Sequence, residues 1–304
     1  MDGWYASSVA NLPPFWAKSG EFVPHGANFG TFESIMDLKT VLEYSSLERI
    51  DDGRIAIVTM RRAEKRNALS LDVMRELTRV FRSLADDADV CVTILRGEGP
   101  AFSAGHDLQE LRCGDRTTAQ DEARFEEIFD ACVQLMEAIQ EVPVPVIAEV
   151  ATVATAAGCQ LVATCDLAVA STHARFATPG VRIGLFCSTP MVAVSRTIAR
   201  KRAMEMLLTG DFVDGPTAAQ WGLVNRCVPP ENLAEETLAL ARKIAQASRA
   251  VVRLGKRAFY EQIEMNQRDA YQAMKQVMSR NALLADAQEG IGAFIEKRAP
   301  VWQD

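Results

Sequence analysis

Residues 101–108 of the chain read AFSAGHDL, and residues 154–160 read ATAAGCQ. We call these stretches the first junction and the second junction, because each follows a run of β-branched residues and is predicted to open a helix. A strand-to-helix junction leaves backbone N–H groups without partners at the positive end of the helix dipole. Two junctions that face each other can hold a negatively charged oxygen between two N–H donors. Spacing alone favours a plain turn at each place, and neither junction matches a phosphate-binding glycine motif.

Around the junctions, hydrophobic periodicity predicts strands that alternate with helices. The expected strands cover residues 55–60, 90–95, 146–150 and 167–170. A helix with apolar residues at helical spacing is expected to begin after Ser70, whose hydroxyl is suited to an N-cap. Further helices are expected through residues 125–139, 159–163 and 191–199. Such alternation predicts an α/β fold.

The same patterns divide the chain into three parts. Residues 1–35 carry Pro13, Pro14 and Pro24 and show neither a helical nor a strand period, so we expect an N-terminal arm that is extended or partly disordered. Residues 36–232 hold the alternating core. Residues 233–304 are mostly helical in pattern, and we expect them to form a helical C-terminal segment.

Composition and charge exclude several classes of protein. The 304 residues are 48% hydrophobic and 24% charged, which is ordinary for a globular protein. The formal net charge is −7, and the basic residues are scattered rather than gathered in a block. We therefore expect no nucleic-acid partner and no binding to a membrane surface. No apolar run reaches the length of a membrane span.

The seven cysteines form no CxxC pair and show no Cys/His spacing typical of a metal site. Their odd number and apolar surroundings predict reduced, mainly buried thiols and no bound metal. Residues 1–30 contain no arginine and include Asp2 and Glu21, which argues against a transit peptide. We therefore expect a cytoplasmic protein.

Nine short stretches, taken together, resemble the crotonase (enoyl-CoA hydratase/isomerase) superfamily in their order and spacing. They are KRNAL (65–69), FSAGHDL (102–108), PVIAEV (145–150), AGCQL (157–161), CDL (165–167), FATP (176–179), LTG (208–210), AQWGLV (219–224) and FIEKR (294–298). The resemblance covers about residues 45–304 and omits the arm. Residues 158–163, 176–181 and 184–190 resemble one subgroup of this family in particular.

The resemblance implies a spiral of repeated ββα units, followed by C-terminal helices that build a homotrimer or a dimer of trimers. It also implies an acyl-CoA thioester as the bound partner, with coenzyme A as part of the substrate and no separate cofactor. The thioester oxygen would lie between the backbone N–H groups of His106 and Ala157. The residues that the resemblance assigns to substrate binding are Lys65, Arg66, Ala68, Ala104, His106, Asp107, Leu108, Gln109, Ala157, Gly158, Phe186, Phe294 and Lys297, the last two often from a neighbouring subunit.

Two positions depart from the pattern of the family's hydratases, which carry glutamates there. This chain has Gln160 and Gly180 instead. Hydration needs one group to deprotonate water and another to protonate the α-carbon, and a carboxylate in an apolar pocket can do either. An amide orients water but cannot take its proton near neutral pH. We therefore expect weak or absent hydratase activity, and isomerisation is doubtful for the same reason.

No other residue pair replaces the two glutamates convincingly. An imidazole at position 106 can titrate near neutrality, but a packing or surface role for the ring is favoured. Three functions remain open: an enzyme that stabilises a thioester enolate, an authentic enoyl-CoA hydratase of fatty-acid metabolism, and a non-catalytic acyl-CoA-binding module.

Overall fold

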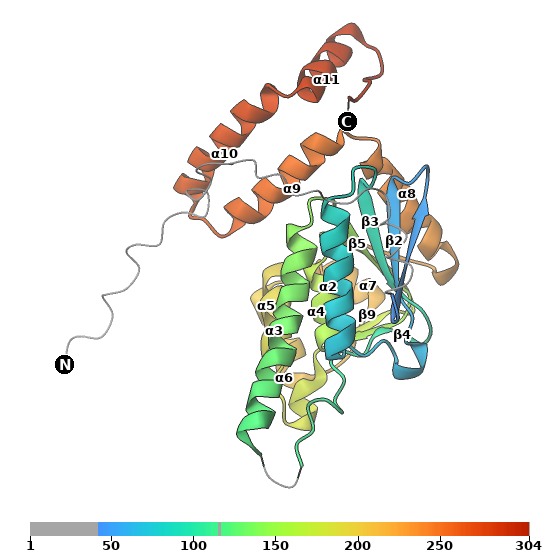
Figure 1. Cartoon of the computed structure of the whole chain (residues 1–304), viewed down its shortest axis with the longest axis vertical. Helices are drawn as coiled ribbons and strands as arrows, with labels where there is room; N and C mark the ends of the chain where they lie inside the picture. The colour runs from blue at the N-terminus through green and yellow to red at the C-terminus, as the bar shows by residue number, and fades with distance from the viewer. Residues whose placement is uncertain (1–41, 115–116, 304) are drawn as a thin grey trace, which may run out of the picture. The chain divides into compact units, whose positions relative to one another are not determined.

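The computed structural model describes residues 42–114 and 117–303 (Figure 1). The arm expected over residues 1–35 lies outside the described residues. The larger of two sheets has six strands, in the spatial order β1 (Ser45–Ile50), β2 (Ile55–Met60), β3 (Val92–Gly97), β5 (Val146–Val150), β7 (Leu167–Ser171) and β10 (Arg226–Val228). Strand β1 pairs antiparallel with β2, and the other neighbours pair in parallel.

The smaller sheet has four strands, in the order β4 (Ala101–Ser103), β6 (Val153–Thr155), β8 (Arg175–Ala177) and β9 (Val213–Asp214). Along the chain, one strand of the larger sheet is repeatedly followed by one strand of the smaller sheet and then by a helix. The units are β3-β4-α3 (Ala119–Glu141), β5-β6-α4 (Ala157–Thr164) and β7-β8-α5 (Ser188–Thr197). The predicted α/β fold of repeated ββα units is therefore confirmed.

The larger sheet is buried on both faces because its side chains alternate between two apolar clusters. On β2, Ala56, Val58 and Met60 join the cluster formed with α2 (Leu71–Ala85) and α3. Ile55 and Ile57 join the cluster on the other face, where α8 (Leu233–Ala245) packs. Figure 1 shows α2 and α3 side by side, and the two helices pack against each other.

Local signals placed many elements correctly. Strands β2 and β5 have the predicted bounds, and β3 begins two residues later than the predicted strand. The Ser70 hydroxyl caps α2 by accepting the amide of Val73 at 3.4 Å. Two further helices precede the C-terminal segment, α6 (Arg200–Thr209) and α7 (Gly215–Trp221).

The first junction does not open a helix, so that prediction was wrong. Residues 108–111 form turns instead, and the next α-helix, α3, begins at Ala119. The reason is local, because the Asp107 carboxylate accepts the amide of Gln109 at 3.0 Å. A side chain that bonds the backbone two residues on competes with helical hydrogen bonds.

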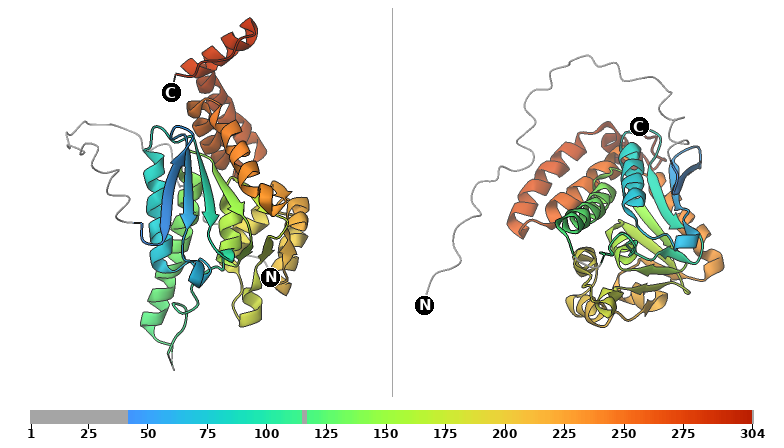
Figure 2. Two further views of the ribbon diagram at one scale, coloured as in Figure 1. Left: turned by 90° about the vertical axis from the view of Figure 1, so that its right-hand side faces the viewer. Right: turned by 60° about the horizontal axis from the view of Figure 1, so that its bottom comes forward.

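The C-terminal residues form four helices: α8, α9 (Arg249–Ile263), α10 (Gln267–Ala282) and α11 (Ala285–Glu296), which run from orange to red in Figure 2. Helices α9–α11 and the connection between α10 and α11 expose many large apolar side chains, among them Phe259, Tyr271, Met278, Leu283, Phe294 and Ile295. No helix among the described residues is both long enough and apolar enough to cross a membrane.

A buried ion pair fastens α9 to the core. The Lys256 ammonium donates to the Asp166 carboxylate at 2.7 Å and to the carbonyl oxygens of Ile139 and Val144 at 2.8 and 3.0 Å. The Tyr260 hydroxyl donates to the other Asp166 oxygen at 2.9 Å. Removal of one partner would leave a buried charge unpaired, which is costly. The cluster therefore holds α9, the first of the helices with exposed apolar side chains, against the core.

Candidate active site

The two junctions touch each other at the edge of the smaller sheet. Gly105 has a φ of +86°, and a Cβ built on it would lie 3.0 Å from the amide nitrogen of Ala157. The Thr155 hydroxyl also donates to the carbonyl oxygen of Ala104 at 3.1 Å. Only glycine fits at position 105, because it combines a left-handed backbone with this close approach.

The amide of His106 is turned away from its hydrogen-bonded neighbour. Leu69 donates to the carbonyl oxygen of Gly105 at 2.8 Å and accepts the amide of Asp107 at 3.3 Å. Leu69 and His106 form a parallel bridge in which the N–H of His106 points away from Leu69. It points to the other side of the strand, where β6 pairs with β4. Among the described residues, it has no hydrogen-bond acceptor.

The amide of Ala157 is free for a different reason. Ala157 is the first residue of α4, and the N–H groups of a first helical turn have no acceptor within the helix. Ala156 precedes it with φ 50° and ψ −120°, and no side chain caps the helix. The helix comes close to β4, since a Cβ at Gly158 would lie 2.3 Å from the carbonyl oxygen of Ser103.

The positive end of α4 therefore lies where the two junctions meet. It adds a partial positive charge to the free amides of His106 and Ala157, and both amides belong to the main chain. Such an arrangement is suited to a negatively charged oxygen.

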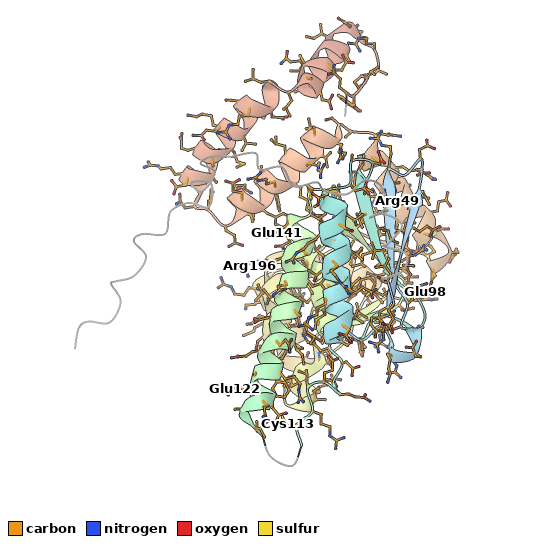
Figure 3. The ribbon with its side chains drawn as sticks, viewed as in Figure 1. Arg49, Glu98, Cys113, Glu122, Glu141 and Arg196 are labelled. Carbon is orange, nitrogen blue, oxygen red and sulfur yellow. The ribbon has the colours of Figure 1, made fainter. Side chains whose placement is uncertain are left out.

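The side chain of Gln160 lies one turn after Ala157 on α4 and is buried. Its carbonyl oxygen accepts the thiol of Cys132 on α3, with an S···O distance of 3.7 Å. Burial raises the pKa of Cys132 to about 12, so this group is a thiol donor near neutral pH. Figure 3 shows the side chains along α3, between Glu122 near its start and Glu141 at its end.

The His106 ring packs against Phe129 of α3. Its centroid is 5.4 Å from that of Phe129, and the ring planes make an angle of 82°. Phe129 lies three residues before Cys132, so both side chains lie on the same face of α3. The two ring nitrogens of His106 are buried, and at least one of them has no hydrogen-bond partner among the described residues, because only the main chain of Leu69 is close enough to bond the ring. Burial lowers the pKa of the imidazole more than the hydrogen bond with the Leu69 main chain raises it, so the ring is neutral at pH 7.

Position 180 has no room for a side chain. A Cβ at Gly180 would lie 2.4 Å from the carbonyl oxygen of Leu185 and 2.8 Å from the sulfur of Cys187. The amide of Leu185 donates back to the carbonyl oxygen of Gly180 at 2.9 Å, which closes the loop. Phe186 follows at the surface and is half-exposed.

The segment that carries Lys65, Arg66 and Ala68 is held against the first junction. The Asn67 side chain donates to the carbonyl oxygens of Glu98, labelled in Figure 3, and Ala101 at 2.9 and 2.8 Å. Ala104 donates to the carbonyl oxygen of Arg66 at 3.0 Å. Lys65 and Arg66 are exposed, as are Leu108 at the end of the first junction and Gln109 after it. The structure thus brings these predicted residues together with Ala104, His106 and Asp107.

The other two predicted binding residues lie elsewhere on the chain. Phe294 is on α11, Lys297 caps that helix, and α11 packs against α9 and α10. Sequence reasoning missed Phe129 and Cys132, although their spacing places them on one helical face. Among the described residues, no group of three or more metal-ligating side chains gathers.

Comparisons with known proteins agree with the fold. The sequence matches the enoyl-CoA hydratase/isomerase family over residues 51–304. It is 43% identical over 289 residues to a Mus musculus protein named enoyl-CoA hydratase domain-containing protein 3, mitochondrial, an alignment that covers 95% of each chain. The human protein of that name is 49% identical over 251 residues, which cover 83% of this chain and 81% of the human one.

Solved structures give the same result. The crystal structure of human enoyl-coenzyme A hydratase domain-containing protein 3 has a TM-score of 0.81 and 47% identity, and the match covers 86% of this chain and 100% of the human chain. An enoyl-CoA hydratase of Mycobacterium smegmatis also has a TM-score of 0.81, with 44% identity and coverage of 86% and 99%.

Proposed function

Because this chain belongs to the enoyl-CoA hydratase/isomerase family, we propose that it binds an acyl-CoA thioester and stabilises the thioester enolate between the backbone N–H groups of His106 and Ala157. The observation that carries this proposal is the contact between the two junctions, each of which contains a main-chain amide without an acceptor. Removal of a proton beside a thioester carbonyl moves negative charge onto its oxygen. Prepositioned donors stabilise that charge, and loss of one such donor typically costs about 10²–10³ in rate.

The exposed cations of the segment next to the first junction support binding of the coenzyme A part. Lys65 and Arg66 lie at the surface on a loop that Asn67 holds in place. Their charges suit the phosphates of coenzyme A. Phe294 and Lys297 complete this site from a neighbouring subunit in the proposed homotrimer or dimer of trimers. The exposed apolar side chains of α9–α11 support that assembly. Light scattering of the purified protein measures the subunit number.

The proposed reaction does not use the two-carboxylate hydration of the family. Gln160 offers an amide, and Gly180 has the backbone of Leu185 where a side chain would begin. We therefore infer weak or absent hydratase activity. With crotonyl-CoA, the enone absorbance is expected to stay constant, and a decrease far above the buffer rate would contradict this. Gln160→Glu combined with Gly180→Glu would not restore activity, because the second glutamate displaces residues 185–187.

A chromophoric thioester tests the two amides without any turnover. Polarisation of its carbonyl extends electron delocalisation, so the absorption maximum of 2,4-hexadienoyl-CoA is expected to move to longer wavelength on binding. Titration calorimetry gives the affinity in parallel. Saturable binding without a spectral shift would contradict the two-amide site and would favour a plain acyl-CoA-binding module.

A cytoplasmic location remains part of the proposal, although the vertebrate relatives are named mitochondrial. Fractionation of cells that express the full chain tests it, and recovery in mitochondria would contradict it.

A further inference from the structure

The imidazole of His106 is the polar side chain at the junctions that the proposed function leaves without a role. Both of its nitrogens are buried, and the main chain of Leu69 is the group close enough to the ring to act as a hydrogen-bond partner, so at least one nitrogen has no partner among residues 42–114 and 117–303. Buried polar atoms in folded proteins nearly always have partners, so a ring nitrogen left without one requires an explanation. A ligand that is bound during function supplies one.

The position of the ring follows from its own main chain. The amide of His106 is one of the two proposed donors to the thioester oxygen, and the ring lies within one side-chain length of that amide. The α-carbon of an acyl-CoA is attached to the carbonyl carbon that carries this oxygen. The edge-on contact with Phe129 holds the ring against α3, on the face that also carries Cys132.

Other side chains near the junctions are poorly suited to accept a proton. The Asp107 carboxylate accepts the amide of Gln109, and the Glu110 carboxylate accepts the amide of Leu71 at 2.9 Å. Gln160 is an amide, and the thiols of Cys132 and Cys187 have pKa values raised by burial. The neutral imidazole, in contrast, has a lone pair on one of its two nitrogens.

We propose that the His106 imidazole is the base that removes a proton from the α-carbon of the bound acyl-CoA, an inference that rests on the proposed function. The Cα–H bond breaks, its electron pair forms the carbon–carbon double bond of the enolate, and the carbonyl π pair moves onto the thioester oxygen. The proton goes to the imidazole nitrogen and forms an imidazolium. Return of the proton to carbon restores both groups. One residue thus binds the enolate oxygen through its amide and balances the new negative charge through its ring.

Exchange of α-hydrogens for deuterium tests this step without knowledge of the physiological reaction. Butyryl-CoA is incubated with the full-length protein in D₂O, and NMR follows the loss of the α-proton signal. The wild-type protein is expected to catalyse exchange, and His106→Gln is expected to reduce its rate by about 10²–10⁴-fold, the usual contribution of a general base. His173→Gln, which removes an exposed histidine, is the matched control and should exchange at the wild-type rate.

The spectral shift of 2,4-hexadienoyl-CoA separates this proposal from the proposed function. His106→Gln keeps the main-chain amide, so both the shift and the affinity should stay within about threefold of wild type. His106→Ala with added imidazole is the second variant, and recovery of exchange supports the role of the ring. The base assignment is overturned if wild type shifts the spectrum without exchange, or if His106→Gln exchanges normally. If wild type gives no spectral shift, both proposals fail.

Discussion

The two junctions present a backbone amide at the same place but reach that geometry differently. In the first junction the left-handed backbone occurs at Gly105, with φ +86°. In the second it occurs at Ala156, with φ 50°, where an L side chain is strained by about 1–3 kcal/mol. The first junction leads into turns, whereas the second leads into α4. The first carries an imidazole beside its amide, whereas the second places a buried glutamine one turn later.

This difference indicates that the two junctions contribute different groups to the site. The second junction contributes a helix terminus and a strained turn, which are main-chain features that many side chains would tolerate. The first junction contributes an unstrained backbone, because glycine occupies its left-handed position, and the imidazole that we propose to transfer a proton. Strain in a folded protein persists only where the surroundings hold it, and here Ala156 is held by its hydrogen bond to Ala177 at 2.9 Å.

Substitution of Gly105 by alanine should have the largest effect on the contact between the two junctions. The new Cβ would combine an unfavourable φ with contacts of 2.8–3.0 Å to Thr155, Ala156 and Ala157. We expect a loss of about 2–4 kcal/mol in the free energy of unfolding, measured by urea denaturation, and loss of the hexadienoyl-CoA shift. Gly114→Ala is the control, because nothing lies within 4 Å of that Cβ. Normal stability and a normal shift in Gly105→Ala would show that the junctions do not need this contact.

Gly158→Ala tests the same contact from the other side. Its Cβ would lie 2.3 Å from the carbonyl oxygen of Ser103, so α4 must move away from β4. We expect a loss of about 1–3 kcal/mol, with a weakened spectral shift. Gly255 lies on α9, and nothing lies within 4 Å of a Cβ built on it, so Gly255→Ala should instead raise the free energy of unfolding by up to about 1 kcal/mol. Equal effects of the two substitutions on stability would refute the close packing.

Ala156→Gly should relieve the strain of the second junction. Glycine adopts positive φ freely, and the gain exceeds its extra entropy in the unfolded chain, so we expect about 0.5–1 kcal/mol of stabilisation with the spectral shift retained. Ala163→Gly, within α4, should destabilise by about 1 kcal/mol. If Ala156→Gly destabilises as much as this control, the second junction is not strained.

The smallest effect concerns pH. Burial lowers the pKa of His106 in the folded protein, so the unfolded chain takes up the proton first as pH falls through about 6.5. The wild type should therefore lose stability relative to His106→Gln between pH 7.5 and 5.5. Urea denaturation at several pH values measures this, with His173→Gln as the reference for an exposed histidine. A constant difference across this range would mean that the ring nitrogens are accessible to water in the folded protein.

Local sequence predicted much of the fold because the signals were short-range. Strand β2 and strand β5 are runs of apolar, largely β-branched residues, and Ser70 caps α2 as its position predicted. The family resemblance is confirmed by the match over residues 51–304. The helix expected after the first junction was wrong because the turn formed by Asp107 outweighed the helical pattern. The division at residues 35 and 232 stays a prediction.

The amino-acid order alone specified the alternation of strands and helices, the family, and the two stretches that contain the free amides. Tertiary structure alone brought those stretches into contact, since parallel pairing of β4 with β6 joins segments about fifty residues apart. It also buried the His106 nitrogens and filled the space beside Gly180 with the backbone of Leu185. Hydrophobic period and capping act over a few residues, whereas contact, burial and steric exclusion depend on which distant segments the sheets bring together.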